Sequence, residues 1–191
     1  MAKGAVLSRE QQAALSLITV TAGLLQVSVQ RPGEAPRTIG FHFPGDIVAL
    51  GDEDLAADLE IKALLPVRAE GMGAAPEGSQ SPGVPDIWER LCRQLALEQR
   101  ARSSYAFDHI DGRLAAFFLR LTPVCSNGDE ARPVVHLPMR RNDLADYLGI
   151  RTETLSRHLT NWRASGVIQL PSPRTAVLRD RAYLEALAAG R

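Results

Sequence analysis

Residues 140–159 decide the fold of the C-terminal part of the chain, and they read RRNDLADYLGIRTETLSRHL. Two short helices that cross need a small residue at the crossing, which Ala145 supplies, and Gly149 permits a left-handed turn four residues later. Apolar residues are spaced to fill the wedge between these helices: Leu144, Leu148, Ile150, Leu155 and Leu159. The stretch therefore predicts a helix-turn-helix with helices over 141–148 and 152–164.

The second helix of such a motif enters the major groove of DNA by its N-terminal end. Glu153, Ser156 and Arg157 lie at that end, and Glu153 and Arg157 are four residues apart, so they share a face. Arginine bonds guanine O6 and N7, and glutamate accepts from cytosine N4. We predict that these three residues contact base edges. The alternative is an exposed ion pair within the helix, worth about 0.3–0.5 kcal/mol and without function.

Charge is distributed unevenly although the chain is neutral overall. Residues 1–85 hold 6 Lys or Arg against 10 Asp or Glu, whereas residues 86–191 hold 16 against 12. Residues 139–181 contain eight arginines and four acidic residues. An acidic front and a basic back are typical of a sensor joined to a nucleic-acid reader.

Four residues around the predicted motif are expected to contact the DNA backbone: Arg140, Arg141, Thr152 and Arg174. Arginine pairs with phosphate through two parallel hydrogen bonds, and hydroxyl groups also bind phosphate oxygens. The alternative for the arginines is a solvated surface.

The N-terminal part of the chain predicts short strands separated by turn signals. One strand, over 24–30, alternates in part between polar and apolar residues, as a strand with one buried face does. Strands are predicted at Leu17–Thr21, Leu24–Gln30, Thr38–His42, Ile47–Leu50 and Leu59–Val67. Regularly spaced short strands indicate a small sandwich or roll, so the fold class is α+β.

A change of composition marks the predicted domain boundary. Residues 71–85 hold four glycines and three prolines and predict a loop, whereas residues 86–109 contain neither and predict a long helix. Trp88, Leu91 and Leu95 form the apolar stripe of that helix. Further predicted elements are a helix over 111–121 that ends at Thr122-Pro123, a strand over 134–137, a hairpin with its turn at 171–174, and a terminal helix over 181–189. The predicted domains are 1–84, 85–110 and 111–191.

The stretch 139–168 resembles the DNA-binding domain of the Crp/Fnr family, and Glu153–Arg157 (ETLSR) resembles the recognition motif of its Fnr/FixK branch. Residues 39–48 (IGFHFPGDIV) resemble a strand pair in the sensor roll of Fnr-like proteins. The resemblance implies a β-roll sensor like a cyclic-nucleotide-binding domain but shortened at its N-terminus, a long dimerisation helix and a C-terminal winged helix-turn-helix. His158 departs from the pattern, since that position is usually apolar, and we expect it to be half-exposed.

The same resemblance implies a function. The protein would be a homodimeric transcription regulator that binds an inverted repeat of TTGAT-like half-sites in double-stranded DNA and contacts RNA polymerase, without enzymatic activity. No apolar run of about 18 residues and no secretory signal is present, so we expect a cytoplasmic protein that does not enter membranes.

Ligands known for the family fit this sequence poorly. The chain has two cysteines, Cys92 and Cys125, none near the N-terminus, and Leu65 stands at the roll position that an iron–sulfur cluster requires. Residues 51–58 are acidic and would repel the phosphate of cyclic AMP. The histidines and cysteines lack metal-ligand spacing. The sequence thus disfavours both an iron–sulfur cluster and cyclic AMP, and no cofactor is predicted.

Two other classes of protein remain as alternatives. A cupin-like small-molecule-binding protein would share the roll but would need clustered ligands in the strands, where His42 is the one histidine. A winged-helix module for protein interaction would have no evident use for the polar residues Glu153, Ser156 and Arg157.

Overall fold

The computed structural model describes residues 1–50, 58–73, 110–126 and 133–190, together with residues 89, 91, 92, 94 and 95. The chain divides into two units, Met1–Ser103 and Ser104–Arg191. Most of the predicted dimerisation helix, including Trp88, lies outside the described residues. Leu91 and Leu95 are helical, and the side chain of Leu95 is 56% exposed. The three predicted domain boundaries stay a prediction.

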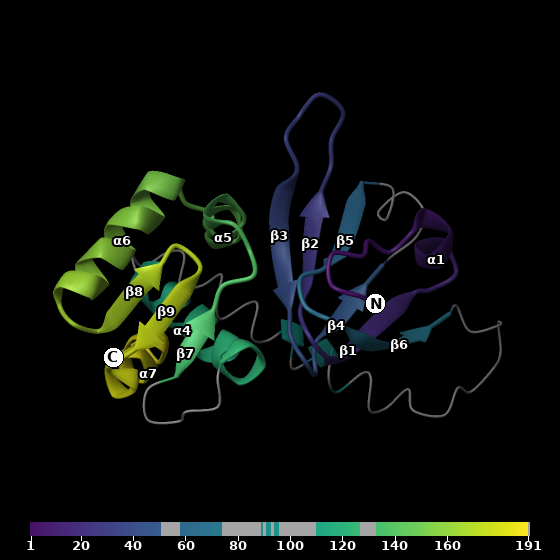
Figure 1. The fold of residues 1–191 in the computed structure, drawn as a ribbon. Coiled ribbons are helices and arrows are strands. Elements are labelled where there is room, and N and C mark those ends of the chain that lie inside the picture. The colour runs from purple at the N-terminus through teal and green to yellow at the C-terminus, as the bar shows by residue number, and fades with distance from the viewer. Residues whose placement is uncertain are drawn as a thin grey trace. The chain divides into compact units, whose positions relative to one another are not determined.

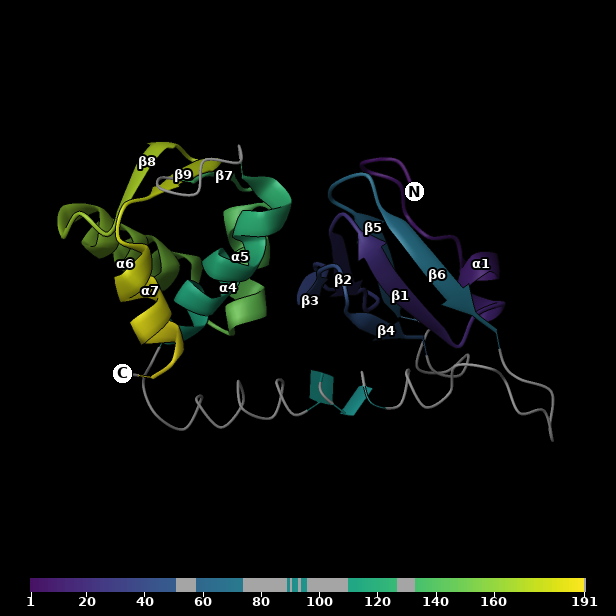
Figure 2. The same ribbon diagram turned by 90° about the horizontal axis from the view of Figure 1, so that it is seen from below.

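The first unit contains two three-stranded antiparallel sheets with the strand orders β4-β1-β6 and β3-β2-β5 (Figure 1). Figure 2 shows β1 and β6 of one sheet running side by side. The strands are β1 (Leu17–Ala22), β2 (Leu25–Val29), β3 (Arg37–His42), β4 (Ile47–Ala49), β5 (Leu59–Ala63) and β6 (Arg68–Met72). Ile18 and Val20 of β1 share one apolar core with Leu25 and Val27 of β2 and Ile61 of β5. This small roll agrees with the predicted α+β class.

Strand β2 differs from its prediction, because both of its faces are buried. Leu25 and Val27 lie in the core, but Gln26 and Ser28 on the other face are buried as well. Gln26 Nε2 donates a hydrogen bond to Thr38 Oγ1 at 2.6 Å. Gln26, which contributed to the prediction of a solvated face, is therefore part of a buried hydrogen-bonded pair with Thr38.

The strand predicted over 59–67 is too long, because its last four residues lie in neither sheet. β5 ends at Ala63 and pairs with β2, whereas β6 pairs with β1 in the other sheet. Pro66, between these strands, has no N–H for a strand ladder. Its carbonyl oxygen would lie 2.2 Å from a Cβ at Gly23, whose φ is +91°, so the turn between β1 and β2 requires glycine. β6 also takes the first residues of the predicted loop, up to Met72.

A short helix, α1 (Arg9–Ala13), was not predicted. Ser8 Oγ accepts a hydrogen bond from the backbone N–H of Gln11, and Gln11 Oε1 accepts one from the backbone N–H of Ser8. This capping box satisfies two amides that would otherwise lack partners at the start of the helix. Its S-x-x-Q signature is present in the sequence and could have revealed the helix.

The side chain of Gln94 closes the free edge of β4, an outer strand of its sheet. Gln94 Oε1 accepts from the backbone N–H of Ile47 at 2.7 Å, and Gln94 Nε2 donates to the carbonyl of Ile47 at 2.8 Å. The N–H and carbonyl of Ile47 that face away from β1 are thereby paired. The described part of the long helical segment is thus attached to the roll through an edge strand.

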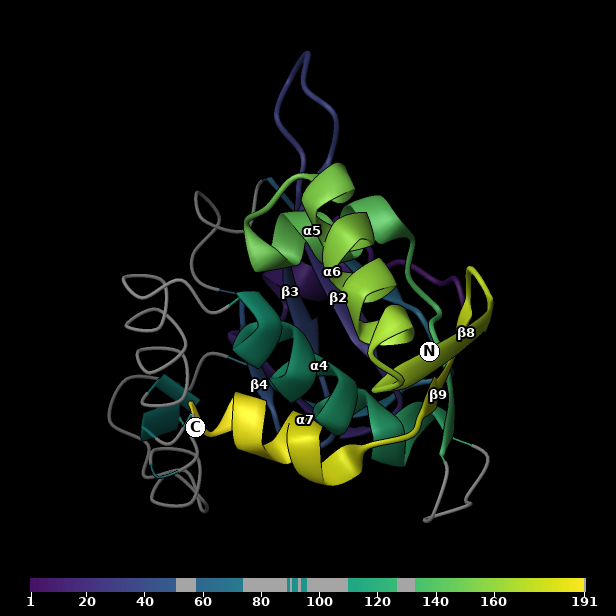
Figure 3. The ribbon, with the colours of Figure 1, turned by 90° about the vertical axis from the view of Figure 1, so that its left-hand side faces the viewer.

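The second unit packs helices against a small sheet with the strand order β7-β9-β8. Figure 3 shows α4 and α7 lying side by side, with α5 and α6 next to them. Its elements are α4 (Ile110–Cys125), β7 (Val134–His136), α5 (Arg141–Leu148), α6 (Thr152–Ala164), β8 (Ile168–Ser172), β9 (Thr175–Leu178) and α7 (Arg181–Ala188). The order of two helices followed by a hairpin confirms the predicted winged helix-turn-helix.

Two predicted ends in this unit are wrong, and both involve proline. α4 continues past Pro123 to Cys125, because a proline in the last turn removes only one backbone hydrogen bond. β8 continues to Ser172 through Pro171, which an outer strand tolerates at a shift of register. The hairpin turn is therefore formed by residues 173–174.

Candidate nucleic-acid interface

The turn between α5 and α6 has the geometry that the sequence predicts. Gly149 adopts a left-handed conformation with φ 65° and ψ 33°, and the N–H of Ile150 donates to the carbonyl of Ala145 at 3.0 Å. Ala145 is buried, 1% exposed, so a larger side chain has no room there. At the start of α5, Asp143 Oδ2 accepts from the N–H of Arg140 at 2.9 Å and caps the helix. Both helices begin and end at the predicted residues.

Helix α6 has one apolar face and one polar face. Leu155, Leu159 and Trp162 are buried, at positions one turn apart. Trp162 lies with its ring centroid 6.2 Å from that of Phe118 on α4. These side chains fix which face of α6 points away from the unit.

The three predicted base-reading residues lie on the outward face. Glu153, Ser156 and Arg157 are all exposed. Within the described part of the chain, neither Glu153 nor Arg157 has an ion-pair or hydrogen-bond partner. The alternative of an ion pair between them is therefore not formed in the free protein. The carboxylate and the guanidinium are both available to a partner outside the chain.

The predicted backbone-contacting residues lie on three elements. Arg140, just before α5, has a side chain that is 76% exposed, with Nε 3.3 Å from Asp143 Oδ2. Thr152 opens α6, and its Oγ1 donates to Asn142 Oδ1 at 3.2 Å. Arg174 is exposed in the turn of the β8–β9 hairpin. These three side chains are accessible at the surface of the unit.

Arg141 differs from the other predicted phosphate contacts because it is partly buried. Burial lowers the pKa of its guanidinium below the ordinary value. Its Nη1 is inaccessible to solvent and has no hydrogen-bond partner among the described residues. A buried donor without a partner is costly, and because Nη1 is closed to solvent a phosphate cannot reach that atom in this conformation.

The hairpin that carries Arg174 is held in shape by hydrogen bonds. Ser172 Oγ donates to Thr175 Oγ1 at 3.0 Å, and the N–H of Arg174 donates to Ser172 Oγ at 3.2 Å. The carbonyl of Arg174 accepts from the N–H of Leu137 at 2.9 Å. The position of Arg174 is therefore fixed on both sides of the turn.

His158 makes a contact that the sequence did not predict. Its side chain is 21% exposed, in line with a half-exposed residue, and Nδ1 lies 2.8 Å from Asp111 Oδ1 on α4. The two residues are 47 positions apart, so no local pattern links them. The contact joins the helix that carries Arg157 to the first turn of α4.

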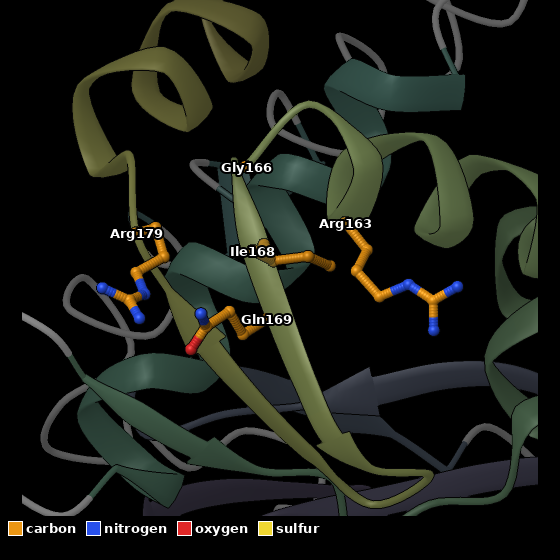
Figure 4. A pocket seen from close by; sticks show the side chains of 5 residues that line it. All are labelled: Arg163, Gly166, Ile168, Gln169 and Arg179. Carbon is orange, nitrogen blue, oxygen red and sulfur yellow. The ribbon is translucent and has the colours of Figure 1, made fainter.

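A groove of about 420 Å³ lies at the opposite end of α6 from Glu153. It is lined by Arg163, Gly166, Ile168, Gln169 and Arg179. Figure 4 shows that the side chains of Arg163 and Arg179 point to opposite sides of β8. The two guanidiniums therefore do not converge on one small anion, and the groove is not a built anion site.

The groups that could bind a metal or react as thiols are dispersed. In residues 1–50, 58–73, 110–126, 133–190 and the five isolated positions, no three His, Cys, Asp or Glu side chains are arranged to hold a metal ion. Cys125 is buried, and burial raises the pKa of its thiol to about 11. Cys92 is exposed on the helical segment.

Over the same described stretches, no helix combines the length and apolar character of a bilayer span.

Comparison with protein families gives a match over the second unit. Residues 112–187 match the Crp-like helix-turn-helix domain. The nitrogen fixation regulation protein FixK of Bradyrhizobium diazoefficiens is 30% identical over 197 residues, which cover 97% of this chain and 79% of that protein. The transcriptional activator protein FnrA of Stutzerimonas stutzeri is 27% identical over 198 residues, covering 98% and 79%.

Solved structures share the fold over nearly the whole chain. A transcriptional regulator of the CRP/FNR family from Thermus thermophilus aligns with a TM-score of 0.74 at 20% identity, covering 99% of this chain and 96% of that one. FixK2 from Bradyrhizobium japonicum aligns with a TM-score of 0.69 at 21% identity, covering 97% and 93%. Each of these solved structures therefore contains regions that align with both units of this chain.

Proposed function

Because this chain belongs to the Crp/Fnr family, in its Fnr/FixK branch, and is a DNA-binding transcription regulator of that type, we propose that it reads an inverted repeat of TTGAT-like half-sites as a homodimer. One observation carries the proposal. Glu153, Ser156 and Arg157 are exposed at the N-terminal end of α6, and their side chains have no partner among the described residues, while the apolar face of α6 is buried. A carboxylate facing a polyanion is unfavourable unless it accepts from a base, so Glu153 favours reading over general attraction.

Each side chain has a distinct role in this proposal. Arg157 donates to O6 and N7 of the guanine in the half-site, and Glu153 accepts from the amino group of the paired cytosine. Ser156 adds a hydroxyl between them. Each good base contact is worth about 1–3 kcal/mol of discrimination against a wrong base.

Phosphate contacts hold the helix in place. Arg140 and Thr152 lie at the starts of the two helices and Arg174 lies in the hairpin turn, so they can contact the backbone on both sides of α6. No side-chain hydrogen bond caps α6 in this fully described segment, so its first amides can bind a phosphate oxygen. Arg141 contributes less to this network, because part of its guanidinium is buried.

Reading of an inverted repeat requires two copies of the reader related by a two-fold axis, about 34 Å apart. Leu95 on the helical segment is exposed, which supports the proposed dimer contact there. By the sequence pattern, Trp88 and Leu91 would take part in the same contact. Contact with RNA polymerase is part of the proposal, and no catalytic step is. Transcription with purified polymerase from a promoter that contains the repeat tests the polymerase contact.

Fluorescence anisotropy with an inverted TTGAT duplex and a scrambled duplex tests the central claim. The wild type should bind the repeat tightly and with strong salt dependence, whereas the Glu153→Ala/Arg157→Ala variant should treat both duplexes alike. The matched control is Arg181→Ala/Glu185→Ala, which removes the same two charges from an exposed pair on α7. Equal binding of both duplexes by the wild type would contradict the proposal, and a cupin-like or protein-interaction role would then have to be tested. Native mass spectrometry tests the dimer, which a strict monomer would exclude.

A further inference from the structure

The contact between His158 and Asp111 links the recognition helix to α4. Nδ1 of His158 lies 2.8 Å from Oδ1 of Asp111, with side chains 21% and 39% exposed. A carboxylate oxygen accepts hydrogen bonds, so the N–H at Nδ1 of His158 donates the hydrogen bond to Oδ1 of Asp111. The contact is a directed hydrogen bond between two helices rather than a diffuse attraction of surface charges.

The position of this contact along α6 matters. His158 directly follows Arg157, whereas the aromatic contact between Trp162 and Phe118 lies one turn further toward the C-terminal end. The polar contact is therefore the one nearer to the proposed base-reading end. A rotation of α6 about its axis would be resisted there by a bond whose length and direction are both restricted.

We propose that His158 and Asp111 are positioning residues, whose hydrogen bond sets the orientation of Glu153 and Arg157 toward DNA. This inference rests on the proposed function, because it explains how α6 is held in the orientation that base contacts require. Base readout depends on bidentate geometry, so a small rotation of α6 weakens guanine contacts more than phosphate contacts. Loss of the bond should therefore lower sequence discrimination rather than general DNA affinity.

The test depends on which atom donates. In asparagine the amide nitrogen is the same number of bonds from Cβ as Nδ1 is in histidine, whereas in glutamine it lies one bond further out. His158→Asn should retain the contact and His158→Gln should lose it. His158→Ala and Asp111→Ala remove it from either side. Glu185→Ala is the matched control, because it breaks an exposed pair of the same 2.8 Å length within α7.

The expected results concern the ratio of affinities for the inverted TTGAT duplex and a scrambled duplex. His158→Ala and Asp111→Ala should each lower this ratio about tenfold, and the double variant should be no worse than either one. His158→Asn should stay within about twofold of the wild type, as should Glu185→Ala. An unchanged ratio in the alanine variants, additive effects in the double variant, or equal losses for Asn and Gln would overturn the inference.

Hydrogen exchange of the free protein separates this inference from the proposed function. Amides of residues 154–158 should exchange faster in His158→Ala and Asp111→Ala than in the wild type, with His158→Asn restored. If the wild type does not distinguish the duplexes, the proposed function fails, and unchanged exchange would independently overturn the positioning role. Faster exchange with an unchanged affinity ratio would also overturn it, because the bond would then only stabilise the fold.

Discussion

Polar side chains are buried and paired in strand β2, whereas those at the start of helix α6 are exposed and lack partners among the described residues. In β2, Gln26 is buried and its Nε2 donates to Thr38 Oγ1 at 2.6 Å, so this amide is already paired within the unit. In α6, Glu153 and Arg157 lie in solvent without a partner from the described chain. Burial of a polar group is costly unless it is paired, whereas an exposed group is paired by water.

This difference separates polar residues that stabilise from polar residues that recognise. A paired and buried group such as Gln26 contributes to the fold, and its loss should appear in the free energy of unfolding. An exposed group without a partner contributes little to stability, but a ligand with complementary atoms can replace its water. Substitutions of the two kinds of residue should therefore change different quantities, either the free energy of unfolding or the affinity for DNA.

The first prediction concerns the Glu153→Ala/Arg157→Ala variant. Two base contacts worth about 1–3 kcal/mol each are lost, so affinity for the inverted repeat should fall by about 3 kcal/mol, roughly 100-fold. The free energy of unfolding should change by less than about 0.5 kcal/mol, because both side chains are exposed and have no partner in the described part of the chain. Anisotropy and urea unfolding measure the two quantities. A variant that is strongly destabilised would show that these residues serve the fold.

The second prediction concerns Thr38→Val, which should change stability and leave DNA binding unchanged. Gln26 would keep a buried donor without its acceptor, so the free energy of unfolding should fall by about 2 kcal/mol. The Gln26→Leu/Thr38→Val double variant should recover part of that loss, because no polar group is then left unpaired. Binding of the inverted repeat by the folded protein should be unchanged. A double variant less stable than Thr38→Val would contradict this account.

The third prediction concerns pH and the buried thiol of Cys125. Its pKa is raised from 9.0 to about 11, so above pH 9 the unfolded chain releases a proton that the folded chain retains. This contribution to stability is complete below pH 9 and is lost as the pH rises toward 11, about 1 kcal/mol by pH 10. Cys125→Ala should remove this part of the pH dependence, whereas Cys92→Ala, at an exposed site, should not. Urea unfolding from pH 8 to 10.5 measures it.

The fourth prediction concerns Arg174→Ala in the hairpin turn. Loss of one phosphate contact should weaken binding of both duplexes alike, by about 1 kcal/mol at low salt, and should reduce the slope of log affinity against log salt by about 1. The ratio between the repeat and the scrambled duplex should stay constant. A selective loss for the repeat would instead show that Arg174 contacts a base.

The sequence was sufficient for the part of the site that is local along the chain. Ala145, Gly149 and the apolar residues of 140–159 determine two helices and their turn, because each constraint acts between residues a few positions apart. The same periodicity places Glu153 and Arg157 opposite Leu155 and Leu159, so their exposure could be predicted. For the same reason, both helices begin and end where the pattern predicts.

Contacts between groups far apart along the chain could not be predicted from local patterns and depend on how the elements pack. Gln26 with Thr38, Gln94 with Ile47 and His158 with Asp111 are pairs separated by 12 to 47 residues. That β5 and β6 belong to different sheets likewise depends on which strand each of them pairs with. A linear pattern gives the faces of an element, but the packing of other elements decides which polar atoms lose water and must therefore be paired.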